Sequence, residues 1–193
     1  MTGTRMNDNK ALTGSDPFLR VTAAISTLCG WIAAGMVVAA VFITCQMIFV
    51  RFVLNHSTIW QTEAVVYLVI AATLIGLPYV QRLKGHVNVD LIPIALQFGP
   101  RKVLYVVVLS ASALVMGMLA FYGYDFWQVA YQRGWKSDTV WGVRLWIPYL
   151  AIPVGFGLMT LQIVADIWAV LKGHERPFGL VRDPLNASGT GEL

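Results

Sequence analysis

Charged residues are scarce in this chain of 193 residues. Lys, Arg, Asp and Glu together make up 12% of the sequence, whereas apolar residues make up 57%. A soluble domain usually has about 25% charged residues. The deficit is concentrated in four runs that contain no charged residue at all, namely residues 21–50, 64–81, 103–124 and 145–165. This distribution argues against an ordinary soluble domain.

Each charge-free run is long enough to cross a bilayer as a helix. A hydrocarbon core about 30 Å thick needs about 20 helical residues. A soluble helix of that length would carry a polar stripe, and these runs have none. The sequence therefore predicts an all-α integral membrane protein with four transmembrane helices. The first helix is expected to begin at Pro17 or Val21 and to end at Leu54, and the second to begin near Thr58 and to end before Gly85. The third and fourth helices are expected at residues 102–124 and 146–170.

A short apolar segment, residues 89–98, lies between the expected second and third helices. Asp90 can cap a helix there, and Pro93 is tolerated in its first turn. The segment is too short to span the bilayer, so we predict a short interfacial helix on the inner membrane surface. The flanking residues 1–16 and 173–193 are polar and are expected to be flexible cytoplasmic tails of a transmembrane domain at 17–172.

Residues that bind metals or cofactors are few. Cys29 and Cys45 would lie about 24 Å apart on one helix, which is beyond disulfide reach. A haem-binding anchor needs axial histidines inside helices, whereas His56, His86 and His174 fall in predicted loops. The sequence shows no nucleophile–base pair, phosphate-binding glycine loop or zinc-ligand spacing. We therefore predict no enzyme activity, no cofactor and no metal site.

The apolar runs also lack the ionisable residues that usually mark a substrate or ion pathway. Their polar residues are expected instead to join one helix to another; these are Thr44, Gln46, Thr73, Ser110, Ser112, Thr160 and Gln162. A non-catalytic accessory role follows. A haem-binding or quinone-linked respiratory anchor and a self-sufficient small transporter are the alternatives.

The distribution of basic residues predicts the orientation. With the N-terminus inside, ten of the 14 Lys and Arg residues lie in cytoplasmic segments, as the positive-inside rule requires. Both termini are therefore expected in the cytoplasm. The net charge of +4 needs no nucleic acid to explain it.

The segment RFVLNHSTIWQTE, residues 51–63, gathers polar side chains between two apolar runs. Thr58 and Gln61 have capping-box spacing, and Glu63 is expected in the first helical turn, where a carboxylate suits the helix dipole. Trp60 suits the interfacial aromatic belt. Arg51 and Glu63 are expected to form an ion pair that holds the turn.

A second aromatic segment, GYDFWQVAYQRGWKSDTVWGVRLW, follows the third run. An aromatic belt accounts for most of its Trp and Tyr residues. Trp135 and Trp141 are the candidates for a partner-facing patch.

These motifs resemble those of the small membrane subunit of tripartite ATP-independent periplasmic (TRAP) transporters, the DctQ-like family, over residues 18–172. Arg51-Phe52 resembles the family's Arg-aromatic pair, Trp60 and Glu63 its Trp-x-Glu-Glu motif, and Gly76 its helical glycine. The Gly-His-x-x-Val-Asp motif is matched by residues 85, 86, 89 and 90, and WIPYLAIPVGFGLMTLQ looks like the family's fourth helix. Thr62 stands where the family often has its first Glu.

The resemblance implies a scaffold subunit of a sodium-coupled transporter in the bacterial inner membrane. Its partners would be a large permease, a periplasmic binding protein that delivers an organic acid, and membrane lipids. The residues expected at structural or partner contacts are Arg51, Asn55, Trp60, Glu63, Gly76, Arg82, Gly85, His86, Asp90, Trp135, Trp141 and Arg144.

Overall fold

The computed structural model describes residues 17–83 and 98–172, and the side chains of 98–102 are not described. Its helices are α2 (Pro17–Phe52), α3 (Ile59–Arg82), α5 (Phe98–Gln132), α6 (Trp146–Tyr149) and α7 (Ala151–Leu171). Leu150 alone separates α6 from α7, and together they form one apolar segment, Trp146–Leu171. With α2, α3 and α5, this makes four helices long and apolar enough to span a membrane among the described residues. The prediction of an all-α membrane protein with four spans is confirmed.

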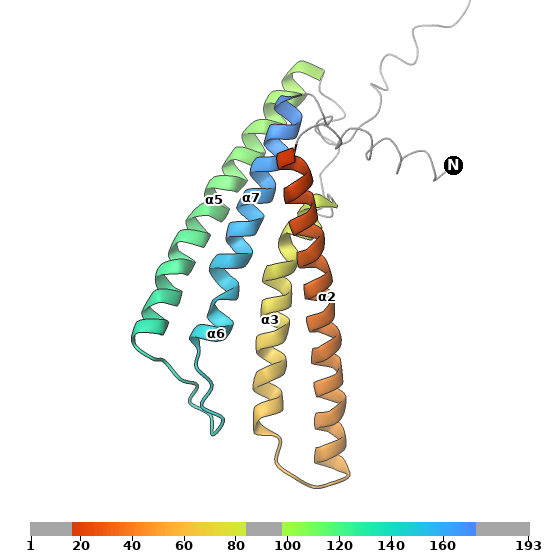
Figure 1. Ribbon diagram of the computed structural model, residues 1–193, viewed down its shortest axis with the longest axis vertical. Helices are drawn as coiled ribbons and strands as arrows, with labels where there is room; N and C mark the ends of the chain where they lie inside the picture. Colours follow the sequence, from red (N-terminus) through yellow and green to blue (C-terminus); the bar gives the residue numbers. More distant parts are fainter. Residues whose placement is uncertain (1–16, 84–97, 173–193) are drawn as a thin grey trace, which may run out of the picture.

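The helices lie side by side in the order α2, α3, α7, α5 (Figure 1). The antiparallel pair α2–α3 and the pair α5–α7 are joined where α3 packs against α7. We call the end with Pro17 and Leu171 the terminal end, and the end with residues 53–58 and 133–145 the loop end. The two pairs separate toward the loop end, so the chain forms a splayed layer and not a closed four-helix bundle.

Large apolar side chains cover the outside of this layer. Trp31 is 73% exposed, Phe42 72% and Phe121 63%. In water such a surface would favour association. In hydrocarbon it costs nothing, and the helical backbone satisfies its own hydrogen bonds there. The exposed surface therefore fits lipid or another membrane protein.

Small residues allow the helices to pack closely. A Cβ at Gly155 of α7 would lie 2.6 Å from the carbonyl oxygen of Leu74 in α3, and a Cβ at Gly30 of α2 would lie 2.5 Å from the ring of Tyr79. At Gly155 two backbones meet, and at Gly30 the backbone of α2 meets a side-chain ring; small residues that permit such approach are usual where helices associate in membranes. The most buried helix is α7, whose Ile163 and Val170 are 1% exposed.

The third span differs from its predicted bounds. It was expected to end at Tyr124, but α5 continues to Gln132 and has 35 residues, about 52 Å. The polar residues after 124 remain helical because a helix need not stop at the membrane surface. The last turns of α5 also pack on α6: Trp127 Nε1 donates to the carbonyl of Trp146 at 3.0 Å, and the Tyr131 and Trp146 rings meet edge to face.

The predicted outer loop is correspondingly shorter. Residues 135–145 form a small hairpin with an antiparallel bridge between Lys136 and Arg144. Leu145 N donates to Trp135 O at 3.0 Å, and Ser137 N donates to Val143 O at 2.9 Å. This segment is called the hairpin below.

The start of α3 also differs from expectation. Thr58 is the N-cap residue, but its side chain makes no capping hydrogen bond, and Glu63 lies beyond the first turn. The predicted capping box is therefore wrong, because the Gln61 side chain is buried, at 3% exposed, and does not turn back to cap the helix. The first helix ends two residues earlier than expected, and Asn55 follows at a φ of 53°. Asn tolerates this left-handed conformation better than most residues.

Several expectations fall outside the described residues. They concern residues 89–97 of the expected interfacial helix, the tails at 1–16 and 173–193, and the expected contact residues Gly85, His86 and Asp90. Phe98, which was expected to end the interfacial helix, is instead the first residue of α5.

Candidate functional site

Glu63 is the centre of a polar cluster at the loop end. Its Oε1 accepts hydrogen bonds from Tyr67 Oη at 2.6 Å and from Ser137 Oγ, and its Oε2 accepts one from Thr139 Oγ1 at 2.5 Å. Tyr67 comes from the next turn of α3, whereas Ser137 and Thr139 come from the hairpin. One carboxylate with several acceptor sites thus binds three hydroxyls, and it fixes the hairpin to α3.

Aromatic contacts reinforce this attachment. The rings of Trp60 in α3 and Trp141 in the hairpin lie 6.1 Å apart. Trp135 meets Phe126 of α5 edge to face at 5.9 Å. Such ring pairs add to the energy of apolar burial. Trp135 and Trp141, which we expected at a partner, thus make contacts within the chain.

The expected pair of Arg51 and Glu63 is not formed between these two described residues. Glu63 binds hairpin hydroxyls instead, and Arg51 is an exposed residue in the last turn of α2. The sequence reasoning missed Ser137 and Thr139, which lie 74 and 76 positions from Glu63. The sequence marks Ser137 and Thr139 only as two hydroxyl residues in the loop after the third span.

A second polar network joins three helices toward the terminal end. Ser26 Oγ of α2 donates to Gln162 Oε1 of α7 at 2.6 Å, and Gln162 Nε2 donates to Asp166 Oδ1 at 2.8 Å. Gln81 Nε2 of α3 donates to Asp166 Oδ2 at 3.1 Å. The expectation that Gln162 links helices is confirmed, and Asp166, expected only at the edge of a run, belongs to the same network.

Arg82, the last residue of α3, reaches across to α2. Its Nη1 donates to Ala23 O at 2.8 Å and to Thr27 Oγ1. Three other threonines expected between helices instead bond their own helix: Thr44, Thr73 and Thr160 each donate to the carbonyl four residues earlier. In these three a local carbonyl satisfies the hydroxyl, so no partner helix is required.

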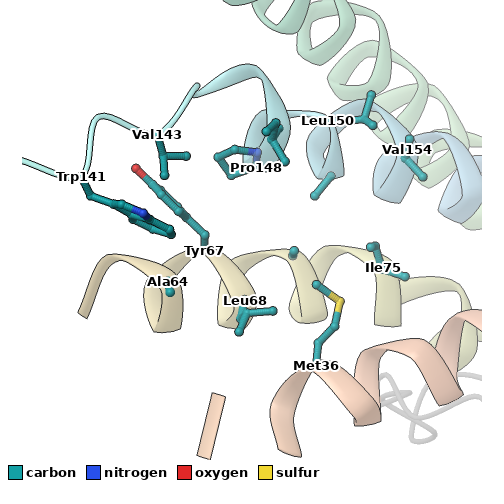
Figure 2. A pocket seen from close by; sticks show the side chains of 13 residues that line it. Met36, Ala64, Tyr67, Leu68, Ile75, Trp141, Val143, Pro148, Leu150 and Val154 are labelled. Atoms are coloured by element: carbon teal, nitrogen blue, oxygen red, sulfur yellow. The ribbon is translucent and has the colours of Figure 1, made fainter. Parts of the chain in front are cut away.

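An apolar groove of about 500 Å³ opens between α3 and α7 below the hairpin. Figure 2 shows Ala64, Leu68 and Ile75 of α3 on one side of it, and Pro148 and Val154 on the other. Met36, Tyr67, Ala71, Trp141, Val143, Ile147, Leu150 and Ala151 complete its lining. We call this space the α3–α7 groove. Its apolar walls offer little to an organic acid, which needs hydrogen-bond donors or cations.

Possible metal ligands do not gather in the part of the chain that the structure describes. Among the described residues no group of His, Cys, Asp and Glu is suited to hold a metal ion. His56 lies in the connection between α2 and α3 and not within a span. The two polar networks instead fix α3 at both of its ends.

Comparison with known proteins identifies the family of the chain. Residues 40–173 match the sequence model described as "Tripartite ATP-independent periplasmic transporters, DctQ component". The match covers more than half of the chain. The chain belongs to this family.

Curated relatives agree. The chain is 23% identical over 180 residues to a "C4-dicarboxylate TRAP transporter small permease protein DctQ" of Vibrio cholerae, covering 81% of this chain and 76% of the relative. It is 30% identical over 112 residues to an "Ectoine TRAP transporter small permease protein TeaB" of Halomonas elongata, covering 58% of each protein. The match to a DctQ protein of Pseudomonas aeruginosa covers 55% of that relative's length.

Membership in the DctQ family identifies the chain as a small TRAP permease subunit. With its four spans, it is a multi-pass inner-membrane component of a transporter. Proteins of this family work with a large permease and a substrate-binding protein. The family match does not favour the alternative of a haem-binding or quinone-linked anchor.

Proposed function

We propose that this DctQ-family chain is a structural subunit of a sodium-coupled TRAP transporter that takes up an organic acid. A large permease would hold the cargo and sodium sites, and a periplasmic binding protein would deliver the cargo. Two of the curated relatives are named for C4-dicarboxylate and ectoine transporters. Both termini lie in the cytoplasm, as the distribution of basic residues favours.

The observation that supports a structural role is the fixation of α3 at both ends. Glu63 binds the hairpin at the loop end, while Gln81 and Arg82 bind α7 and α2 near the terminal end. A transporter whose mobile part slides through the bilayer needs a second part that stays still. A helix held at both membrane surfaces resists tilting, which is the property such a support requires.

The surface available to a partner is mostly apolar. Exposed faces of α2 and α5 carry Trp31, Phe42 and Phe121, and either face suits contact with the large permease. Of the residues we expected at contacts, Arg51 and Arg144 are exposed at the loop end and remain free to meet a partner there. Trp60, Glu63 and Arg82 instead contact other segments of the same chain.

The test replaces Glu63 by Ala in the assembled transporter. Without the carboxylate the hairpin loses its hydrogen bonds to α3. We therefore expect weaker retention on a tagged large subunit, together with slower uptake into proteoliposomes and an unchanged ratio of sodium to cargo. Asp125→Ala, which removes an exposed carboxylate from the same end, is the matched control and should behave like the wild type.

Two outcomes would contradict the proposal. Normal retention and normal uptake of Glu63→Ala would remove the structural role of the cluster. Sodium-driven accumulation in liposomes that contain only this chain would show that it transports by itself.

A further inference from the structure

The four spans form two units, each with close contacts of its own. In the first unit, α2 and α3 are neighbours, and a Cβ at Gly76 of α3 would lie 3.4 Å from the Cβ of Ala33 in α2. The second unit consists of α5, α6, α7 and the hairpin. Within it, a Cβ at Gly123 of α5 would lie 2.7 Å from Cγ2 of Ile152 in α7.

Aromatic rings fasten the hairpin to the second unit. The Phe126 ring of α5 lies 5.9 Å from the Trp135 ring of the hairpin and 4.9 Å from the Tyr149 ring of α6. Trp127 of α5 donates to the Trp146 carbonyl of α6 at 3.0 Å. The hairpin is therefore part of the same body as α5 and α6, whereas α3 belongs to the other unit.

The two units are packed tightly on the terminal side of Leu74. At Leu74 itself the backbones of α3 and α7 meet, because Gly155 has no Cβ to separate them. Closer to the terminal end, Ser26 of α2 donates to Gln162 of α7 at 2.6 Å, and both side chains are buried. This half of the interface is thus fixed by backbone contact and by a buried hydrogen bond.

On the loop side of Leu74 the units are attached in a different way. Here α3 and α7 separate (Figure 1), and the α3–α7 groove leaves about 500 Å³ unfilled between them, so this region adds little of the packing that joins helices elsewhere. Among the described residues, hydrogen bonds and ring contacts cross this side at two places. Glu63 binds Ser137 and Thr139, and the Trp60 ring meets the Trp141 ring. One carboxylate therefore provides the hydrogen bonds of this attachment.

The second unit has places to bend between its two sides. Leu150 separates α6 from α7, and Pro153 in the next turn has no N–H to donate to the Tyr149 carbonyl. Prolines of this kind are common points of helix bending. Gly134, at a φ of 61°, connects α5 to the hairpin. The loop side of this unit can therefore change its angle while the terminal side stays packed.

We infer that the Glu63 cluster is a latch between the two units. While it is formed, the loop ends are held together; when it is broken, they swing apart about the contact of Gly155 with Leu74. Leu74 lies about 16 Å from Glu63 along α3, at 1.5 Å per residue, so a rotation of about 20° would widen the loop end by about 6 Å. The inference rests on the proposed structural role and refines it, because the support is rigid on the terminal side and adjustable on the loop side.

The test measures the two ends separately, by double electron–electron resonance on the full-length chain in lipid nanodiscs. The two native cysteines are first replaced by Ala. Spin labels on exposed positions of α2 and α5 then report the loop end, with Ile48 and Gln128, or the terminal end, with Leu28 and Val107.

Glu63→Ala removes the carboxylate of the latch. We expect it to lengthen the distance between the loop-end labels by several ångström and to leave the distance between the terminal-end labels unchanged. Asp125→Ala, which removes an exposed carboxylate from the loop end, is the matched control and should leave both distances unchanged.

A second variant breaks the latch from the other side. Ser137→Ala combined with Thr139→Ala removes the hairpin hydroxyls and leaves Glu63 in place. It should lengthen the loop-end distance in the same way, also if circular dichroism shows that Glu63→Ala does not fold.

The inference is overturned if neither variant lengthens the loop-end distance, or if both distances lengthen equally, which would indicate a loosened fold without a pivot. The measurement uses the chain without the large subunit, sodium or cargo. Its failure would therefore leave the proposed transport role standing, and loss of that role would not alter the measured distances.

Discussion

Replacing Gly155 by Ala should separate α3 from α7. Gly155 is buried in α7, and an added Cβ would lie 2.6 Å from the carbonyl oxygen and 2.8 Å from the carbonyl carbon of Leu74. Ordinary contacts of a Cβ begin near 3.4 Å. Both obstructing atoms belong to the backbone of α3 and cannot rotate away, so the helices must move apart by several tenths of an ångström.

The cost follows from overpacking. Inserting a methyl group into a well-packed interface costs about 1–3 kcal/mol, and the upper end is about a hundredfold in the unfolding equilibrium, since 1.4 kcal/mol is tenfold. Ala is the better helix former by about 1 kcal/mol, which offsets part of this cost. We therefore expect a net destabilisation of up to about 2 kcal/mol.

The control is Gly157→Ala on the same helix. A Cβ at Gly157 meets nothing within 4 Å, so only the gain in helix propensity remains, and stability should rise by up to about 1 kcal/mol. The assay is equilibrium unfolding of the full chain in mixed micelles of dodecyl maltoside and SDS, followed by circular dichroism. Equal stability of the two variants would refute the close packing of α3 and α7.

Three further changes test other contacts. Ser26→Ala removes the 2.6 Å hydrogen bond to Gln162 and should lower the free energy of unfolding by about 0.6–1.7 kcal/mol in the same assay. Thr73→Ala loses only a hydrogen bond within its own helix and should lower it by less. Equal losses of stability in the two variants would contradict the link between helices. Asn55 has a φ of 53°, in the left-handed region that Gly adopts freely and Val does not. Asn55→Gly should therefore preserve stability, and Asn55→Val should lower it by about 1–2 kcal/mol. A Val variant of unchanged stability would argue against this backbone conformation. Trp127→Phe removes the N–H that donates to the Trp146 carbonyl and should speed amide hydrogen exchange near α6. Unchanged exchange would contradict the packing of the last turns of α5 on α6.

The sequence reasoning was most successful where a single physical rule applies to each segment. Charge is excluded from hydrocarbon, so the charge-free runs identified the four spans, and α3 begins close to the expected position. It was less successful at the end of α5, which continues eight residues beyond Tyr124. Loss of apolar character marks the membrane surface, but a helix ends only where its backbone finds other partners.

The candidate site was predicted in part. Trp60 and Glu63 were singled out from the sequence, and both hold the loop end together. Their partners could not be predicted, because hydroxyls at 137 and 139 are ordinary loop residues until the fold brings them to α3. The nearby opposite charge of Arg51 suggested the wrong pair for the same reason.

The sequence by itself determined that the chain crosses a membrane four times and belongs among the small TRAP permease subunits, because hydropathy and motif spacing are properties of local segments. Only the tertiary structure decided that α3 lies between α2 and α7, that Glu63 binds the hairpin, and that an apolar groove lies between α3 and α7. Outward faces of all four helices are apolar, so hydropathy cannot order the helices. Their order depends on where small residues such as Gly155 let two backbones approach and where polar side chains meet.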